Sequence, residues 1–346
     1  MEPLDLELPV DLEDIREDWT ALAEQTGNIF STWDWNSISW RHFGSGRTPL
    51  AIACRSRDGR VVAVLPFYVW RERPLRVVRL IGHQVGDQLG PICRPGDRAA
   101  VAAAIVDALS LYRADIFVGE HLPVAEGWSS LLGGQILMSG ESPTLRLDGR
   151  SWDDFLASRS QNLRSKVRGG ERRLMRGHEI RYRLTTNRGQ LNEDLDVLFA
   201  LHSARWVGER TTFMRYQSFH REFAARALDR GWLRLWLLEI DGQPRAAWYG
   251  FRFAGIESFY QGGRDPGWDV DSLGFIILVH SIREALGDGM SEYRFLRGGE
   301  SYKYRFANSD RDVETFAITH GFASRAALAA ARVARKSRFF TNAMYS

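Results

Sequence analysis

Cysteine is scarce in this sequence, with only Cys54 and Cys93 among 346 residues. Two cysteines cannot build the disulfide framework of a small secreted domain, and they suit a reducing compartment. The acidic N-terminus also lacks the positively charged start and the apolar core of a signal peptide. We therefore expect a cytoplasmic protein.

Long apolar stretches are missing as well. The strongly apolar run Phe275–Val279 is far shorter than the roughly 20 residues that a transmembrane helix needs. The sequence therefore predicts no transmembrane segment.

Several motifs are absent, and each absence excludes a class of site. No Gly-x-Gly-x-x-Gly follows an expected strand, and there is no phosphate loop of the Walker type. No His-Glu-x-x-His and no paired Cys-x-x-Cys indicates a metal, and the serine-centred elbow of the hydrolases is missing. We therefore expect no metal, and transfer reactions that depend on backbone groups remain.

Charge of one sign is not in excess, since 46 Lys and Arg face 43 Asp and Glu and give a net charge of +3. This balance does not indicate a nucleic-acid-binding protein, so any basic surface must be local. Hydrophobic residues make up 44% of the chain, with 12 Trp and 19 Phe. The composition is that of a soluble protein with sizeable cores.

The sequence contains a repeat. Leu50–Trp70 aligns without gaps on Leu233–Phe253, so that Asp58-Gly59 falls on Asp241-Gly242. Each copy is typical of a β-hairpin with an Asp-Gly turn. In both copies a third strand, a glycine-containing polar loop, a helix and another strand follow. A repeat of this length indicates two related domains in tandem.

The order of elements predicts an α/β (α+β) protein with two mixed, mostly antiparallel sheets flanked by helices. The expected division is an N-terminal domain over 1–148, a second domain over 149–322 and a basic helical tail over 323–346. No low-complexity linker separates the halves, so we expect them to pack closely around a cleft. Helices are expected at Leu12–Ala23, Trp33–Phe43, Asp97–Tyr112, from Trp152, and at Leu191–Trp206, Phe219–Leu228, Ser272–Leu286 and Ala323–Arg338, with further strands at Arg76–Ile81, Asp115–Val118, Thr144–Leu147, Ile180–Leu184, Ile256–Gln261 and Glu292–Leu296.

This order of elements resembles the GNAT acyltransferase fold in tandem. The residues of the second half resemble the cellulose-biosynthesis-linked acetyltransferases of the CelD/BcsL type and, more distantly, the Fem-type aminoacyltransferases. Four segments carry the resemblance: Ser158–Leu174, Leu201–Trp206, Tyr260–Gly274 and Tyr293–Phe306. The resemblance implies acyl transfer from a thioester, usually acetyl-CoA, to an amine or hydroxyl. A sugar or polysaccharide precursor in exopolysaccharide biosynthesis is the candidate acceptor.

A CoA donor carries a pyrophosphate, which binds well to free amides at a helix N-terminus. Gly262-Gly263 and the loop after them lead to Ser272, which can cap the following helix, and to Gly274, which allows close approach. The donor-binding candidates are Gln261, Gly262, Gly263, Arg264, Ser272, Leu273 and Gly274. Asp269 and Asp271 would oppose an anion, and the GNAT signature is stretched to Arg264, Gly267 and Gly274. A capped structural helix is the alternative.

The first copy has Asp97 where an anion would bind, so we expect it to lack donor binding and to shape the acceptor site. Asp87 and Gln88, in the loop Gly82–Gly90, are the candidates to face the cleft. A solvated, glycine-rich connection is the alternative.

Acyl transfer requires a polarised carbonyl, a base and an acid for the leaving thiolate. A backbone amide of the strand Ser258–Gln261 would polarise the carbonyl. Glu300, Tyr302 and Lys303 follow the next strand and can all move protons. The resemblance places the family's Tyr-Lys pair on Tyr302 and Lys303, and Glu300 is the candidate base, with a capping carboxylate and a packed tyrosine as the alternative.

The acceptor-side candidates lie on two segments of the second half. His202, Arg205 and Trp206 lie on the helix ahead of the second hairpin, where His202 and Trp206 share a face. Tyr260 and Asp265 lie around the end of the third strand. For His202, simple hydrogen bonding is the alternative.

A basic segment opens the second half. Arg164, Arg168 and Arg172 form a helical stripe opposite an apolar face that includes Leu163 and Val167. The stripe is a solvated face, or Arg164 and Arg168 contact an acidic acceptor such as a nucleotide-linked sugar, or the segment binds RNA phosphates. Against RNA binding, the segment has no aromatic residues between its arginines, and stacking on bases requires them.

The tail is basic too, and weak contact with an anionic membrane surface is an expectation for it. Two other functions stay open: a Fem-like transferase that uses aminoacyl-tRNA, and a non-catalytic scaffold in envelope-polysaccharide assembly. Both alternatives keep the fold expected for the acyl-CoA-dependent enzyme and differ from it in the class of partner.

Overall fold

Both expected hairpins are formed in the computed structural model, which describes residues 3–72, 75–205 and 211–330. In the first copy, β2 (Thr48–Arg55) pairs with β3 (Val61–Glu72); in the second, β10 (Leu233–Ile240) pairs with β11 (Gln243–Phe253). Asp241 and Gly242 both have positive φ, 51° and 74°, as a two-residue type I′ turn requires. In the first copy the Asp-Gly pair lies in a longer loop, where only Gly59 has positive φ.

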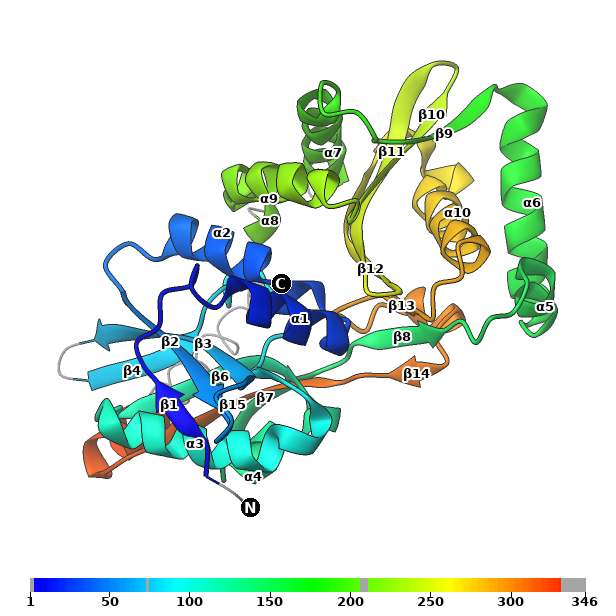
Figure 1. The fold of residues 1–346 in the computed structure, drawn as a ribbon. Helices are drawn as coiled ribbons and strands as arrows, with labels where there is room; N and C mark the ends of the chain where they lie inside the picture. Colours follow the sequence, from blue (N-terminus) through cyan, green and yellow to red (C-terminus); the bar gives the residue numbers. More distant parts are fainter. Residues whose placement is uncertain (1–2, 73–74, 206–210, 331–346) are drawn as a thin grey trace.

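The repeat extends through the following elements (Figure 1). β3 continues into antiparallel β4 (Leu75–Leu80), and helix α3 (Arg98–Leu111) leads to β6 (Ile116–Pro123), parallel to β4. The second copy repeats this order with β12 (Ile256–Arg264), α10 (Leu273–Gly287) and β13 (Glu292–Arg294). The expected duplicated unit is therefore present as a structural unit.

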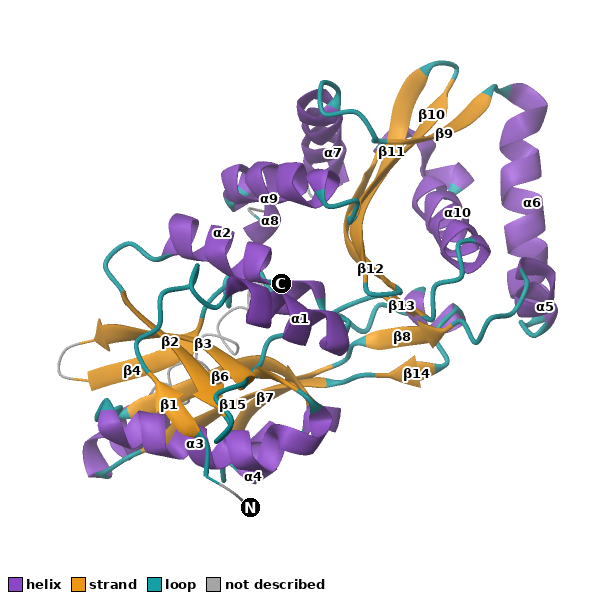
Figure 2. Cartoon of the chain, in the orientation of Figure 1, coloured by secondary structure: helices purple, strands orange, loops and turns teal. Residues whose placement is uncertain are grey.

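The protein has two mixed, mostly antiparallel sheets flanked by helices (Figure 2), which confirms the expected fold class. The first has the order β1-β2-β3-β4-β6-β15-β7, with β5 against β3, and the second β14-β8-β13-β12-β11-β10-β9. The remaining elements are β1 (Asp5–Glu7), α1 (Arg16–Thr26), α2 (Trp33–Phe43), β5 (Ile92–Cys93), α4 (Trp128–Leu131), β7 (Gln135–Gly140), β8 (Pro143–Arg146), α5 (Trp152–Ala157), α6 (Gln161–Gly177), β9 (Ile180–Leu184), α7 (Leu191–Arg205), α8 (Thr212–Arg215), α9 (Gln217–Asp229), β14 (Ser309–Asp310) and β15 (Val313–Thr319).

The two halves exchange strands. β8, which precedes the expected boundary at residue 148, pairs with β13 in the second sheet. β15, from the far end of the second half, inserts between β6 and β7 of the first sheet. Divided by sheets, β8 therefore belongs with the second half and β15 with the first. The expected division by sequence places both strands in the opposite half.

A continuous hydrophobic core joins the halves. Trp35 of α2 is fully buried and packs edge-on against Phe219 and Phe223 of α9, at ring-centroid distances of 5.0 and 4.6 Å. Helices α7, α8 and α9 cover one face of the second sheet, and α10 with α6 covers the other (Figure 1). Because the seam is built of aromatic side chains, each half supports the position of the other.

The first helix begins later than expected, at Arg16 rather than at Leu12. The carboxylate of Asp11 accepts a hydrogen bond from the backbone N–H of Glu13 at 2.9 Å, and this turn competes with a helical start. In the tail, residues 322–330 are helical, and residues 331–346 lie outside the described part of the chain.

Candidate functional site

Strands β12 and β13 separate after a short parallel pairing, and the site lies where they part. Their register runs from Ile256 opposite Glu292 to Ser258 opposite Arg294. β13 then ends, and its chain follows β8, while β12 continues along β11 as far as Arg264. One edge of β12 is therefore left without a strand partner next to two cavities.

A β-bulge lies at the point of separation. Tyr249 pairs with Gln261 and Gly250 with Phe259, so Tyr260 is the extra residue of β12. A Cβ on Gly250 would lie 2.1 Å from the carbonyl oxygen of Ser258, so the bulge requires glycine there. Bulges of this kind bend a strand and redirect its side chains, and they are frequent beside active sites.

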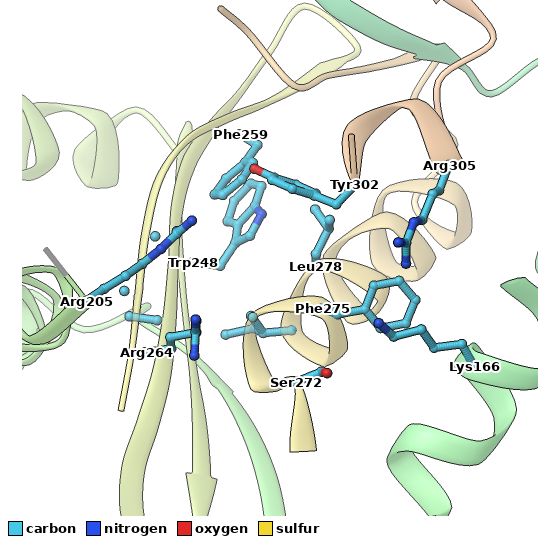
Figure 3. A pocket seen from close by; sticks show the side chains of 15 residues that line it. Lys166, Arg205, Trp248, Phe259, Arg264, Ser272, Phe275, Leu278, Tyr302 and Arg305 are labelled. Atoms are coloured by element: carbon cyan, nitrogen blue, oxygen red, sulfur yellow. The ribbon is translucent and has the colours of Figure 1, made fainter. Parts of the chain in front are cut away.

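The first cavity, of about 280 Å³, lies between β12, α10, α6 and the turn that contains Tyr302. We call it the donor cavity because Arg264, Ser272 and Gly274, which the sequence predicts to bind the donor, line it. Trp248, Phe259 and Phe275 supply apolar walls. Figure 3 shows Arg205 and Arg264 on its strand side and Lys166 and Arg305 on its helix side. Its lining residues, all within the described ranges, include four cationic side chains and no carboxylate: Lys166, Arg205, Ala247, Trp248, Phe259, Gly262, Gly263, Arg264, Ser272, Gly274, Phe275, Ile277, Leu278, Tyr302 and Arg305.

The crowding of positive charge is evident in the pKa values. Burial, and then the charges of Arg305 and Arg173, lower the pKa of the Lys166 ammonium. Burial, and then the charge of Arg205, lower the pKa of Arg264. An anion bound in this cavity would raise the pKa of both Lys166 and Arg264, because a nearby negative charge favours their charged forms.

The start of α10 faces the donor cavity, but Ser272 does not cap it as expected. Ser272 is the N-cap residue with left-handed backbone angles, φ 54° and ψ 45°, and its side chain makes no capping hydrogen bond. Its hydroxyl therefore does not compete with a ligand for the first-turn amides. A Cβ on Gly274 would meet only Cδ of Arg264, at 3.4 Å, so this glycine leaves space on the cavity side. The side chains of Asp269 and Asp271 lie outside the described part.

The second cavity, of about 210 Å³, lies on the other side of the separated strands. We call it the acceptor cavity because Asp87 and Tyr260, which the sequence predicts to bind the acceptor, line it. Four residues line both cavities: Arg205, Phe259, Gly262 and Tyr302. The acceptor cavity also contains Asp87, Tyr260, Gln261, Phe295, Arg297, Glu300 and Lys303. The two cavities therefore meet at the gap between β12 and the chain after β13.

Lys303 holds the loop after β13 in place. Its side chain is 4% exposed, and its ammonium donates to the carbonyl oxygens of Arg297 at 2.7 Å, Gly298 at 3.1 Å and Leu296 at 3.4 Å. It also pairs with Glu300 at 2.8 Å. Leu296 and Gly298 have positive φ, 57° and 108°, so the ammonium stabilises an unusual turn.

Glu300 is more exposed than its partner, with 55% of its side chain accessible. Burial acts to raise the pKa of its carboxyl, but the hydrogen bond and charge of Lys303 outweigh it, and the pKa is lowered. The carboxylate is therefore ionised at neutral pH and able to accept a proton or a hydrogen bond.

Tyr302 extends between the two cavities (Figure 3). Burial, and then the charge of Glu300, raise the pKa of its hydroxyl to about 12. The hydroxyl is thus protonated over the whole physiological range, the state that a proton donor requires.

Asp87 lines the acceptor cavity from the first half. Its carboxylate accepts from Nε of Arg297 at 2.8 Å, and Nη1 of Arg297 lies 2.7 Å from Nε2 of His121. Burial, and then the charge of Arg297, lower the pKa of His121 to about 3, so the ring is neutral. Arg297 also borders a further cavity of about 510 Å³ at the seam. The first half therefore fixes the loop that carries Tyr302.

Other candidates lie elsewhere. His202 is buried, with Nδ1 3.1 Å from the carbonyl of Gly262 and Nε2 3.0 Å from the hydroxyl of Thr211. Arg164 donates to the carbonyls of Ala157 and Arg159, at the end of α5. Neither lines the two cavities, and their hydrogen-bonding groups are used within the fold.

Three further candidates also lie outside the two cavities, and a fourth lies outside the described residues. Arg168 is exposed on α6, and Asp265 pairs with Arg245 at 2.9 Å. Leu273 is buried in the core, and Trp206 lies outside the described residues.

β12 itself contributes glycines and polar groups to both cavities. Gln261 lies in the acceptor cavity instead of beside the donor. A Cβ on Gly263 would lie 2.4 Å from the backbone nitrogen of His202, so Gly263 is required for the packing of α7. The Tyr260 hydroxyl donates to the carbonyl of Val85 at 2.7 Å and joins the two halves.

Sequence reasoning missed Lys166, Arg305 and Arg297 as cavity residues. Lys166 lies on the same basic helix as the stripe, but on its side toward α10, where its ammonium lies 4.6 Å from the centre of the Phe275 ring. The sequence signal that could have distinguished Lys166 from the arginines of the stripe is its angle around the helix relative to the buried Leu163 and Val167.

The first copy has a cavity in the corresponding place, of about 320 Å³, between β5, the start of α3 and the chain after β6. Glu126 lines it, and its carboxylate accepts from Nε1 of Trp128 at 2.8 Å. Burial raises the pKa of Glu126, although the Trp128 hydrogen bond opposes this shift. The first-copy cavity thus contains a carboxyl group beside Arg98 and Arg311, whereas the charged residues that line the donor cavity are all cations.

Among the described residues, no group of three or more His, Cys, Asp or Glu side chains is arranged to hold a metal ion. No helix in residues 3–72, 75–205 and 211–330 combines the length and apolarity needed to cross a membrane.

Comparison with known proteins agrees with this geometry. Residues 161–304 match the model of a family described as acetyltransferase (GNAT) domain. No curated protein matches the sequence.

Three solved structures share the architecture at low identity. FemX is 12% identical, with a TM-score of 0.64, over 91% of this chain and 97% of that one. A C-terminal domain ascribed to a lysylphosphatidylglycerol synthetase of Agrobacterium fabrum is 12% identical, with a TM-score of 0.59, over 94% and 96%. A tandem GNAT protein from the clavulanic acid biosynthesis pathway is 14% identical, with a TM-score of 0.50, over 92% and 99%. At these identities the likeness to the solved structures shows the fold alone, and residues 161–304 are similar to a GNAT acetyltransferase domain.

Proposed function

We propose that this protein is an acyltransferase that moves an acetyl or other acyl group from acyl-CoA to an amine or hydroxyl of an acceptor. The observation that carries the proposal is the meeting of the donor and acceptor cavities at Tyr302, where β12 and β13 separate. This arrangement allows a thioester and a nucleophile to approach from opposite sides with little free motion.

The donor cavity suits a phosphate-bearing donor. Four cations surround it, and its Gly274 side is the first turn of α10, where the helix dipole favours an anion. Its apolar walls, Trp248 and Phe259, stack at 5.4 Å and suit the uncharged arm of the donor. Glu126 in the first copy is consistent with donor binding in the second half alone.

In the proposed reaction the acceptor nucleophile attacks the thioester carbon, so that a C–N or C–O bond forms and the C–S bond breaks. Glu300 takes the proton of the nucleophile, directly or through water, and Tyr302 protonates the leaving thiolate. A backbone N–H of β12 near the Tyr260 bulge polarises the carbonyl. Lys303 acts by holding the loop, because its ammonium already has four oxygen partners.

For the acceptor we propose a sugar or polysaccharide precursor, on the resemblance to cellulose-linked acetyltransferases. The Asp87–Arg297 pair, Gln261 and Glu300 give the acceptor cavity polar groups of both signs, which suit hydroxyl-rich molecules.

Calorimetric titration with acetyl-CoA, longer acyl-CoAs and free CoA tests the proposal. Binding should also protect the native state, by about 2.7 kcal/mol when the ligand is at a hundred times its Kd. The absence of binding by every CoA species would refute it.

An aminoacyl-tRNA donor is the second candidate, favoured by the four cations of the donor cavity. In that case RNA binding should weaken steeply as salt rises, whereas acetyl-CoA should neither bind nor be consumed.

A further inference from the structure

Helix α6 presents a strongly basic face that the acyl-transfer site does not use. Leu163, Val167, Gly170 and Leu174 are buried against the rest of the second half. The exposed part of the helix carries Arg168, Arg172 and Arg176 opposite this buried stripe and Arg173 beside them, and we call these four residues the α6 basic face. α6 forms an outer edge of the molecule (Figure 1).

The charges of this face are not neutralised within the fold. Elsewhere, arginines such as Arg183, Arg252 and Arg297 form ion pairs. No ion pair involves the four arginines of the α6 basic face in the part of the chain that the structure describes. Glu171, the one acidic residue of α6, pairs with Arg283 at 3.2 Å and accepts from Tyr182 at 3.1 Å. Glu179 lies beyond the end of the helix.

This arrangement opposes helix stability. Arg168, Arg172 and Arg176 follow one another at a spacing of four, and like charges at that spacing repel. The overall net charge of +3 shows that the rest of the chain is nearly neutral. A surface that concentrates cations at this cost fits a partner with many negative charges.

We propose that the α6 basic face binds the anionic headgroups of a lipid bilayer. Clusters of four to eight Lys and Arg on an amphipathic helix are typical of such contact. Met175, 56% exposed beside the arginines, adds an apolar side chain that suits the headgroup boundary. The face has no aromatic residue for stacking on bases, which favours lipid over single-stranded RNA. This contact is independent of the proposed acyl transfer.

The test is sedimentation with vesicles of phosphatidylglycerol and phosphatidylcholine in equal parts, compared with phosphatidylcholine alone. We expect binding to the anionic vesicles only, weakened by salt. In the triple variant Arg172→Gln, Arg173→Gln and Arg176→Gln, the partition coefficient should fall about five-fold for each residue and on the order of a hundred-fold in all.

A matched control keeps the change in net charge the same. Arg60, Arg71 and Arg113 are exposed on the first half, and their triple change to Gln should leave vesicle binding as in the wild type. Circular dichroism and urea unfolding establish that both variants are folded. Equal losses in the two variants, no binding of the wild type to anionic vesicles, or retention of an RNA duplex in preference to these vesicles would each overturn the inference.

Discussion

Replacement of Lys303 by Met distinguishes a structural from a chemical role for this residue. The change removes an ammonium that is 4% exposed and leaves the carbonyls of Arg297 and Gly298, now bound at 2.7 and 3.1 Å, without their donor. An unsatisfied buried acceptor costs about 1–3 kcal/mol, and because these two hydrogen bonds are only partly buried, each loss lies near the lower end of that range. The pair with the half-exposed Glu300 adds less than about 1 kcal/mol. We expect the free energy of unfolding to fall by about 3 kcal/mol.

Urea unfolding followed by tryptophan fluorescence measures this loss. Glu300→Gln is the matched control, because it breaks the same ion pair but leaves the ammonium bound to its carbonyls, and it should cost less than about 1 kcal/mol. A Lys303→Met protein as stable as the wild type but without turnover would refute the structural role and return Lys303 to the chemistry.

Four further results are expected. Gly274→Ala should weaken acetyl-CoA binding at least about ten-fold in calorimetry while raising helix stability by up to about 1 kcal/mol, whereas Gly287→Ala, at the open far end of α10, should change stability alone. Tyr302→Phe should lower kcat about a hundred-fold or more with donor affinity unchanged; a wild-type kcat would remove Tyr302 as the proton donor. Asp87→Asn, which removes the negative charge that pairs with Arg297, should alter kcat and the acceptor KM in steady-state assays but not the donor Kd, and a changed donor Kd would count against a role confined to the acceptor side. Since the folded-state pKa of Glu300 is lowered below its ordinary 4.5, the stability advantage over Glu300→Gln should be present above pH 4.5 and disappear as the pH falls through the lowered pKa; an advantage that survives in acid would exclude the ion pair as its source.

Much of the fold could be predicted from local patterns. The Asp-Gly hairpins, the helix Trp33–Phe43 and the strand Ile180–Leu184 appear where alternation, periodicity and turn chemistry indicate them. The exchange of β8 and β15 between the sheets could not be predicted. Short strands carry no signal of their partner, because pairing depends on distant contacts.

The site could be predicted in part. Position after a strand end, with the resemblance for Tyr302, made Tyr302, Glu300 and Gly274 candidates, and all three line one or both cavities. The contacts of Lys303 could not be predicted, because they are made to backbone carbonyls, which are present in every residue type. Ser272 has the residue type of a helix cap, but its backbone is left-handed and its side chain makes no capping hydrogen bond.

A crystal structure with acetyl-CoA bound would show directly whether the two cavities form one acyl-transfer site. We expect the pyrophosphate against the first turn of α10 at Gly274, and the thioester at the gap between the cavities, with its sulfur beside the Tyr302 hydroxyl. Acetyl-CoA bound elsewhere, or with its thioester far from Tyr302, would contradict it.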